Sequence, residues 1–234
     1  MGMMTGFIRQ GLWALADVLF PPTCAGCDSL GAALCPACRA ALEWVPPGRA
    51  LVDLSAPDGL DDFRAALWFG GPAQKALHRL KYRHDVGLAE TLVGLVARRL
   101  ARPELDRHAT LIVPVPLSAE RLAERGYNQA ALLARGLADR WSFRFAPRAL
   151  SRVRATRSQV GLSRADRLAN VEVAFWADRR IVQGRSILLL DDTCTTGATL
   201  QDCARALKVA GAVAVHGLAI AQAPLRQAMA PAGA

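Results

Sequence analysis

The segment 187–200 reads ILLLDDTCTTGATL, and it constrains the fold more than any other part of the chain. Its leading apolar residues predict a buried strand that ends at two adjacent acids, Asp191 and Asp192. Small and hydroxyl-bearing residues follow, and a helical pattern begins at Ala198. In a parallel α/β sheet, ligands bind at the carboxyl ends of the strands, where the helices begin. The segment therefore predicts a ligand site at a strand end of such a sheet.

Strands and helices alternate along the rest of the chain, which supports this class of fold. Hydrophobic periodicity predicts strands at 64–69, 110–113, 143–149, 186–190 and 213–220. It predicts helices at 73–83, 86–101, 118–140 and 198–209, the last of them stopped by Gly211. Because the late strands are apolar throughout, we expect a parallel sheet that is covered by helices on both faces.

The composition changes along the chain divide it into three parts. Residues 1–45 are expected to form an N-terminal helix and a cysteine-rich module, and residues 60–221 to form the α/β domain. The proline-rich stretch 45–48 is interpreted as a linker between them. The Ala- and Pro-rich residues 222–234 are expected to be a loosely held tail.

The N-terminal segment carries no clear targeting signal. Ile8, Leu12, Leu15 and Leu19 fall at helical spacing, which predicts a short amphipathic helix. The chain has no uninterrupted apolar run of the roughly 20 residues that a membrane span needs. No small-residue cleavage site follows the helix. We therefore expect a soluble, cytoplasmic protein without a membrane span.

Four of the six cysteines form two CxxC pairs near the N-terminus: Cys24, Cys27, Cys35 and Cys38. Two such turns, separated by seven residues, can place four thiolates around a tetrahedral Zn²⁺. Because all four ligands would be cysteines, no open position remains, and the predicted zinc is structural. Two disulfides are an alternative that a cytosolic location disfavours. A thioredoxin-like redox pair is another, although it would use a single CxxC in a βαβ setting.

The chain is basic, with 29 Lys plus Arg against 20 Asp plus Glu and a net charge of +9. Genomic base composition can explain the total, since only three of these cations are lysines. It does not explain a cluster of seven arginines between positions 144 and 167, where Asp166 is the single acid. Such a cluster is typical of a surface for a polyanion, such as phosphate, pyrophosphate or nucleic acid.

The loop after the acids suits a phosphate. Residues 195–199 are expected to form a tight turn at a helix N-terminus, where unpaired N–H groups and the helix dipole attract an anion. The members of this loop are Thr195, Thr196, Gly197, Ala198 and Thr199. Asp191 and Asp192 could accept hydrogen bonds from vicinal hydroxyls, so the arrangement fits a ribose 5-phosphate. An ordinary turn with capping threonines is the alternative.

This segment resembles the phosphoribosyl pyrophosphate (PRPP) signature of type I phosphoribosyltransferases, which has an apolar strand, two acids, two further residues and then TTG. The intervening residues are usually apolar in that family, whereas this chain has Thr193 and Cys194. Family members that use 6-oxopurines place an aspartate where Thr195 stands, which argues against hypoxanthine or guanine as the acceptor. The segment differs from a Walker motif because no Gly-Lys-Ser/Thr follows.

Further motifs resemble the ComF family over about residues 20 to 221. They are the cysteine module, Leu80-Lys81, IVPVPL at 112–117, RGYNQ at 125–129, and the pattern TRxQxxLxxxxRxxN at 156–170. The resemblance implies a type I phosphoribosyltransferase-like domain and an association with natural transformation, the uptake of DNA by competent bacteria. It also implies single-stranded DNA or a competence helicase as partners.

The same resemblance implies roles for individual residues if PRPP binds. The 5-phosphate would lie on residues 195–199, and the two acids would hold the ribose hydroxyls, directly or through Mg²⁺. The pyrophosphate would lie near the turn after strand 110–113, where the candidate cations are Lys81, Arg121 and Arg125. Arg157 and Arg167 would close over it as part of a mobile hood.

Several of these roles have plainer alternatives. Arg125 and Asn128 could simply tie a helix to the sheet, and Tyr127 could be a buried aromatic rather than a residue that stacks on a base. No general base is evident. Two hypotheses therefore remain: a phosphoribosyltransferase with an unidentified acceptor, or a non-catalytic module that keeps this fold to bind nucleotide, DNA or a protein partner.

Overall fold

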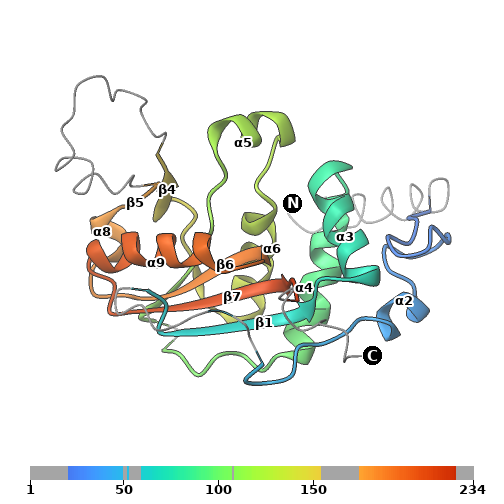
Figure 1. The fold of residues 1–234 in the computed structure, drawn as a ribbon, viewed down its shortest axis with the longest axis horizontal. Coiled ribbons are helices and arrows are strands. Elements are labelled where there is room, and N and C mark those ends of the chain that lie inside the picture. Colours follow the sequence, from blue (N-terminus) through green and yellow to red (C-terminus); the bar gives the residue numbers. More distant parts are fainter. Residues whose placement is uncertain (1–20, 50–51, 53–58, 107, 154–173, 225–234) are drawn as a thin grey trace, which may run out of the picture.

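The structure, a computed structural model, describes residues 21–49, 52, 59–106, 108–153 and 174–224. At its centre lies a five-stranded parallel sheet in the order β1-β7-β6-β2-β3 (Figure 1). These strands are β1 (Asp62–Trp68), β2 (Thr110–Pro114), β3 (Arg144–Phe145), β6 (Ser186–Cys194) and β7 (Ala214–Gln222). A separate antiparallel pair consists of β4 (Leu150–Arg152) and β5 (Phe175–Ala177).

Helices cover both faces of the sheet, as the sequence predicted. They are α2 (Pro36–Ala40), α3 (Gly71–Tyr82), α4 (Gly87–Arg99), α5 (Ala119–Arg125), α6 (Gln129–Trp141), α8 (Arg179–Val182) and α9 (Ala198–Val209). Helices α3, α4 and α6 belong to one apolar core and α9 to the other. Along β6, Leu188 and Leu190 face the first core, whereas Ile187 and Leu189 face the second. This explains why the strand is apolar without alternation.

The predicted α/β class is confirmed: a parallel sheet flanked by helices, with a small four-cysteine module. Helix α9 has the predicted bounds, and Gly211 follows its end with a φ of +93°. The single helix predicted at 118–140 was wrong, because it is two helices. Gly126 ends α5 with a φ of +75°, and the Asn128 side chain caps α6.

Strand lengths also differ from the prediction. The strand expected at 143–149 is limited to the two residues of β3. Strand β7 extends to Gln222, one residue beyond the predicted end of the domain. Strand β6 continues to Cys194, so the two acids lie within the strand rather than after it. Pairing between β2 and β6 ends at Pro114 and Leu190, which leaves that edge of β6 open from Asp191 onward.

The cysteine module packs into the main core instead of standing apart. Cys24 and Leu34 are fully buried within the same cluster as α3 and α4. The backbone around Trp44 pairs with the edge of β1: Val45 N–H donates to the Ala66 carbonyl, and Trp68 N–H donates to the Glu43 carbonyl. Val45, the first residue of the stretch interpreted as a linker, is thus paired with β1.

The amphipathic helix predicted near the N-terminus lies outside the described residues, as do Arg157 and Arg167 of the predicted hood. Among the helices that the structure describes, none combines the length and the apolar character needed to cross a membrane.

Candidate functional site

Residues 195–199 form the N-terminal end of α9, as predicted: residues 195–197 precede the helix, and Ala198 and Thr199 are its first residues. Gly197 is the N-cap of α9 with a φ of +85°, a left-handed conformation that favours glycine. The threonine side chains of this loop are exposed, and Thr196 Oγ1 accepts a hydrogen bond from Ala198 N–H at 3.4 Å. The first turn of α9 contains no acid. A hollow of about 40 Å³, lined by Asp191 and residues 193–200, lies at this loop, and we call it the loop hollow.

Asp192 is buried, with 3% of its surface exposed, and its carboxylate contacts three side chains. Lys81 Nζ lies 2.5 Å from Oδ2. The Thr193 hydroxyl also donates to Oδ2, and Gln129 Nε2 donates to Oδ1, both at 2.7 Å. These contacts join residues from α3, α6 and β6. Asp192 therefore organises the interior of the site.

Asp191 is half-buried, and it lines the loop hollow. Its Oδ1 accepts a hydrogen bond from the Asp192 backbone N–H at 2.8 Å. Burial, followed by the adjacent Asp192 carboxylate, raises the pKa of Asp191 to about 8. The two acids that looked equivalent in the sequence thus have different environments. A cation beside Asp191 would favour its ionised form.

A larger cleft of about 380 Å³ adjoins the loop hollow. It is lined by Lys81, Tyr82, residues 115–117, Arg121, Glu124, Arg125, Gln129, Arg152, residues 191–193 and Thr199, and we call it the basic cleft. The three candidate cations of the prediction are thus brought together with both acids. Asp191, Thr193 and Thr199 line the hollow and the cleft alike, so a ligand that spans both would pass these residues.

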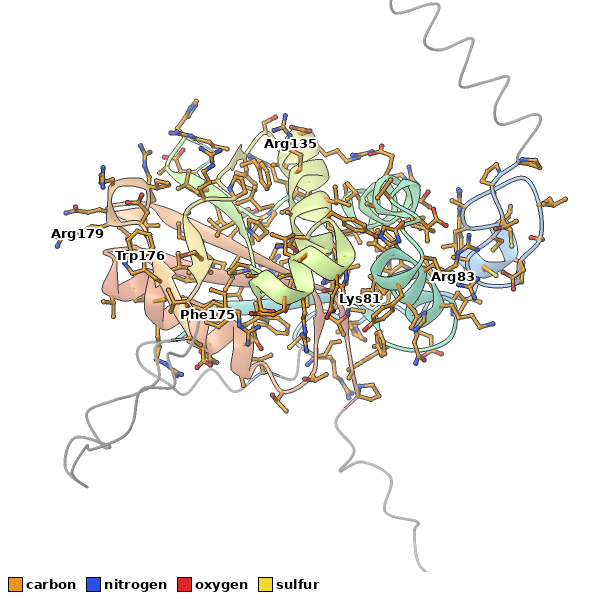
Figure 2. All side chains as sticks on the ribbon, turned by 90° about the horizontal axis from the view of Figure 1, so that it is seen from above. Lys81, Arg83, Arg135, Phe175, Trp176 and Arg179 are labelled. Carbon is orange, nitrogen blue, oxygen red and sulfur yellow. The ribbon has the colours of Figure 1, made fainter. Side chains whose placement is uncertain are left out.

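The elements around the basic cleft explain how it is held open. Helix α5 has no buried residue and stands away from the sheet (Figure 1). Ser118 caps this helix by accepting from Arg121 N–H at 3.3 Å. Lys81 approaches from the last turn of α3 and is labelled in Figure 2. The cleft therefore lies where three helices converge on the open edge of β6.

The structure adds Gln129 to the site, a residue to which the sequence had assigned no role. Only 4% of its surface is exposed. Its amide donates to Asp192, while its Oε1 accepts from Arg125 Nη1. One side chain thus connects the buried acid to a cation of the cleft. The sequence could place Gln129 at the start of α6. It could not show the contact with Asp192, which lies 63 residues away in the chain.

Asn128 and Tyr127 both hydrogen-bond to backbone groups of other elements, and Tyr127 is half-buried rather than buried. Asn128 Oδ1 accepts from the first N–H groups of α6, and its Nδ2 donates to the Val115 carbonyl at 2.9 Å. The Tyr127 hydroxyl donates to the Leu80 carbonyl, and burial raises the pKa of this phenol. Both contacts fasten the start of α6 to the elements that flank the cleft.

The four predicted cysteines form a compact cluster. Their Sγ atoms all lie within 4.8 Å of one another, and those of Cys27 and Cys35 are 3.7 Å apart. Two sulfurs that are each ~2.3 Å from a tetrahedral Zn²⁺ would lie about 3.8 Å apart, so the spacing fits. A Cβ at Gly26 would come within 2.5 Å of Cys38 Sγ, which leaves room only for glycine.

Backbone N–H groups point at these sulfurs, as expected around metal-bound thiolates. Cys24 Sγ accepts from Cys35 N–H at 3.2 Å and from Gly26 N–H at 3.4 Å. Burial raises the pKa of Cys24, but these hydrogen bonds outweigh it and bring the pKa to about 6. Burial and the neighbouring sulfurs raise the pKa of Cys38 to about 12. The cluster can hold a structural metal such as zinc.

The cysteine module is tied directly to α3. Lys75 Nζ donates to the Gly26 carbonyl at 2.8 Å, and Arg79 donates to the Thr23 carbonyl and hydroxyl at 3.2 and 3.0 Å. The same helix carries Lys81 in its last turn. One helix therefore contacts both the cysteine cluster and the buried acid.

The chain is similar in sequence to several bacterial proteins. DNA utilization protein YhgH of Escherichia coli strain K12 is 32% identical over 218 residues, which cover 89% of this chain and 90% of that protein. Competence protein ComFC of Bacillus subtilis is 34% identical over 151 residues, covering 64% and 60% of the two chains. Competence protein F of Haemophilus influenzae is 32% identical over 155 residues, covering 63% and 68%. No family model matches the chain.

Two solved structures are also similar. One is an allosteric regulatory enzyme of purine biosynthesis, with a TM-score of 0.40 and 24% identity over 56% of this chain. The other is the B. subtilis glutamine phosphoribosylpyrophosphate amidotransferase in complex with ADP and GMP, with a TM-score of 0.38 and 21% identity over 57% of this chain. The chain spans 25% of the length of each.

The fold and the site together define an α/β protein with a parallel sheet between two helical layers, a glycine-capped loop beside adjacent acids, and a four-cysteine cluster that can hold a metal. The sequence relatives identify the family within this class of fold. The chain belongs to the ComF family, as the sequence motifs had predicted.

Proposed function

We propose that the protein binds PRPP, or a closely related ribose phosphate, at the loop hollow and the basic cleft. The observation that carries this proposal is the continuity of the two spaces through Asp191, Thr193 and Thr199. A glycine-capped helix N-terminus suits a terminal phosphate, and a cation-lined cleft suits a pyrophosphate. PRPP carries both groups on one ribose ring.

The proposed positions follow from this continuity. The 5-phosphate accepts from the N–H groups at 195–199, and the ribose lies beside Asp191. The pyrophosphate lies against Arg121 and Arg125, which line the cleft on α5. Asp191 offers the carboxylate oxygens that Mg²⁺ prefers, together with pyrophosphate oxygens. Bound Mg²⁺ would supply further neutralisation of the pyrophosphate charge.

If the protein is a transferase, the bond between ribose C1 and the pyrophosphate oxygen breaks as an acceptor atom bonds to C1. The ribose then carries oxocarbenium-like positive charge, which the Asp191 carboxylate would stabilise, while the arginines stabilise the departing pyrophosphate. Asp192 acts indirectly in this scheme, because it holds Lys81 and Gln129 in place.

Calorimetric titration of the zinc-loaded protein with PRPP and Mg²⁺ tests the proposal. We expect wild-type protein to bind, and Asp191→Asn to weaken binding at least about tenfold, because hydrogen bonds to a charged group contribute about 1.5–3 kcal/mol. Asp139→Asn, in an exposed ion pair with Arg135 on α6, is the matched control and should bind as wild type. No binding by folded wild-type protein would refute the proposal.

We infer a second role, in DNA uptake, from the names of the relatives and from one surface feature. An open groove of about 450 Å³ runs between β5 and α9. Trp176, which lines it, is 53% exposed, and Arg179 and Arg205 also border it. Figure 2 shows Trp176 and Arg179 at the end of the molecule opposite Arg83. Exposed aromatic rings beside arginines are the chemistry that binds single-stranded DNA.

Fluorescence anisotropy with a labelled oligothymidylate measures this role. We expect affinity to fall at least about tenfold between 50 and 200 mM salt, since phosphate contacts release counterions. Trp176→Ala should weaken binding about fivefold or more at fixed salt, because it removes a stacking surface. Leu30→Ala, which changes another exposed apolar residue (71% exposed), is the control. Equal affinities for all three proteins would exclude the groove as the binding surface.

A further inference from the structure

Helix α3 lies between the cysteine module and the rest of the fold (Figures 1 and 2). Its first turn lies against the module: the Pro72 side chain would be 3.4 Å from a Cβ placed on Gly26. One turn later, Lys75 Nζ donates to the Gly26 carbonyl at 2.8 Å. The last turn carries Lys81, which lines the basic cleft. The two candidate sites are therefore joined by one helix of 12 residues.

Arg79 makes the most extensive contacts between α3 and the module. Its side chain is only 15% exposed. Nη1 donates to the Thr23 carbonyl at 3.2 Å, and Nη2 donates to the Thr23 hydroxyl at 3.0 Å and to Asp85 Oδ2 at 2.8 Å. Asp28 of the module lies 3.7 Å from Nη1. A mostly buried cation needs its acceptors, so the position of Arg79 depends on the module.

The acceptors of Lys75 and Arg79 are placed by the first CxxC turn. Thr23 precedes this turn, and Gly26 lies inside it. Within residues 21–40, all of which the structure describes, the regular structure consists of the five residues of α2 and one bridge between Thr23 and Leu30. Small modules of this kind become ordered when their metal binds. Without a metal in the cluster, the two cations of α3 would therefore lose acceptors that hold them.

The other end of α3 is held by the candidate site. The Leu80 carbonyl accepts from the Tyr127 hydroxyl, and Lys81 Nζ lies 2.5 Å from Asp192 Oδ2. Lys81 follows Arg79 by two residues, which is less than one helical turn. Because a helix moves largely as a unit, a displacement of Arg79 also displaces Lys81 relative to Asp192.

We propose that helix α3 couples the cysteine cluster to the basic cleft, so that a metal in the cluster and a ribose phosphate in the cleft each raise the affinity for the other. This inference rests on the proposed ribose-phosphate site. Lys75 and Arg79 are positioning residues, because they hold α3 where Lys81 can pair with Asp192. Coupling between binding free energies is reciprocal, so both affinities change by the same factor, typically about 5- to 150-fold.

The zinc affinity of the cluster, measured by competition with a colorimetric chelator that does not bind Mg²⁺, tests the coupling. We expect saturating PRPP with Mg²⁺ to raise the zinc affinity of wild-type protein at least about fivefold. Arg79→Met and Lys75→Met should each reduce this factor at least about twofold. Arg135→Met, which removes a cation from an exposed ion pair on α6, should keep it. A titration without protein corrects for zinc that PRPP itself binds, and thermal unfolding checks that each variant is folded.

The opposing outcomes separate the coupling from the ribose-phosphate site. Equal zinc affinity with and without PRPP, in wild-type protein that binds PRPP, would refute the coupling and leave the site standing. Arg79→Met and Lys75→Met that weaken zinc binding but keep the full factor would show that these residues only support the module, which refutes their positioning role. If folded wild-type protein does not bind PRPP, the ribose-phosphate site is refuted, and Lys81→Met then tests the coupling without a ligand. It should weaken zinc binding at least about twofold, and unchanged zinc affinity would refute the coupling as well.

Discussion

The ion pair between Lys81 and Asp192 allows a quantitative test of how the site is built. Lys81→Met keeps the apolar stem of the side chain but removes its charge. The Asp192 side chain is 4% exposed, whereas the Lys81 side chain is 20% exposed. The reverse change, Asp192→Asn, leaves a lysine that water can partly reach. The two single changes should therefore differ in cost.

The expected magnitudes follow from this asymmetry. Removing one partner of a fully buried pair costs about 3–5 kcal/mol. Gln129 and Thr193 would still donate to Asp192, so we expect Lys81→Met to cost about 2–3 kcal/mol. Asp192→Asn should cost about 1–2 kcal/mol. The double variant should cost less than the sum of the two by about 1–2 kcal/mol, because it leaves no unpaired charge.

Urea unfolding followed by tryptophan fluorescence measures these differences, and thermal unfolding should place Lys81→Met roughly 5–10 °C below wild type. The control is the pair Arg135 and Asp139 on α6. Their side chains are both 63% exposed, and Arg135 Nε lies 3.2 Å from Asp139 Oδ2. The same cycle there should give a coupling below about 0.5 kcal/mol. Additive effects at Lys81 and Asp192 would refute the assignment of this pair as the organising contact of the site.

Three further predictions concern single residues and the cysteine cluster. The raised pKa of Asp191, about 8, means that the folded state keeps a proton that the unfolded state releases near pH 4, so its contribution to stability is lost as pH rises through this window. Asp191→Asn should therefore gain about 1–2 kcal/mol over wild type between pH 5 and pH 8.5 in urea unfolding, and parallel curves would contradict this. Gly197→Ala should cost about 1–2 kcal/mol, because φ is +85° and the new Cβ would lie 2.8 Å from Val52 Cγ1; unchanged phosphate affinity in this variant would argue against the loop as the phosphate site. Elemental analysis should find one zinc per chain, and a chelator should lower the unfolding temperature, whereas Cys203→Ser should retain the metal; a metal-free, equally stable protein would exclude a structural zinc.

Local patterns were sufficient to predict the elements whose signals lie within one segment. Helix α9 matched because its buried residues from Leu200 to Leu207 keep helical spacing and Gly211 follows its end. The two acids and the threonine-rich loop were placed together because they are adjacent in the chain. The four cysteines were found for the same reason, since metal-ligand spacing is a local property.

Features that depend on distant contacts were missed. The extension of β6 to Cys194 follows from its pairing with β7, where Cys194 lies opposite Gln222. The break at Gly126 was overlooked because the helical periodicity continues across it, although a glycine and a capping asparagine marked the boundary. The different environments of Asp191 and Asp192 depend on Lys81 and Gln129, which come from two other elements of the fold.

The contacts of Arg79 illustrate the same limit for function. Its acceptors on Thr23 lie 56 residues away in the chain and come within reach only when the cysteine module packs on α3. The sequence instead directed attention to Lys81, in the last turn of the same helix.

The measurement that tests the central claim most directly is a crystal structure of the zinc-loaded protein with PRPP and Mg²⁺. We expect the 5-phosphate on the N–H groups of residues 195–199, the ribose beside Asp191, and the pyrophosphate against Arg121 and Arg125. The ion pair between Lys81 and Asp192 should remain beneath the ligand. Density for PRPP at another surface, or with the pyrophosphate on the α9 loop, would contradict the proposed site.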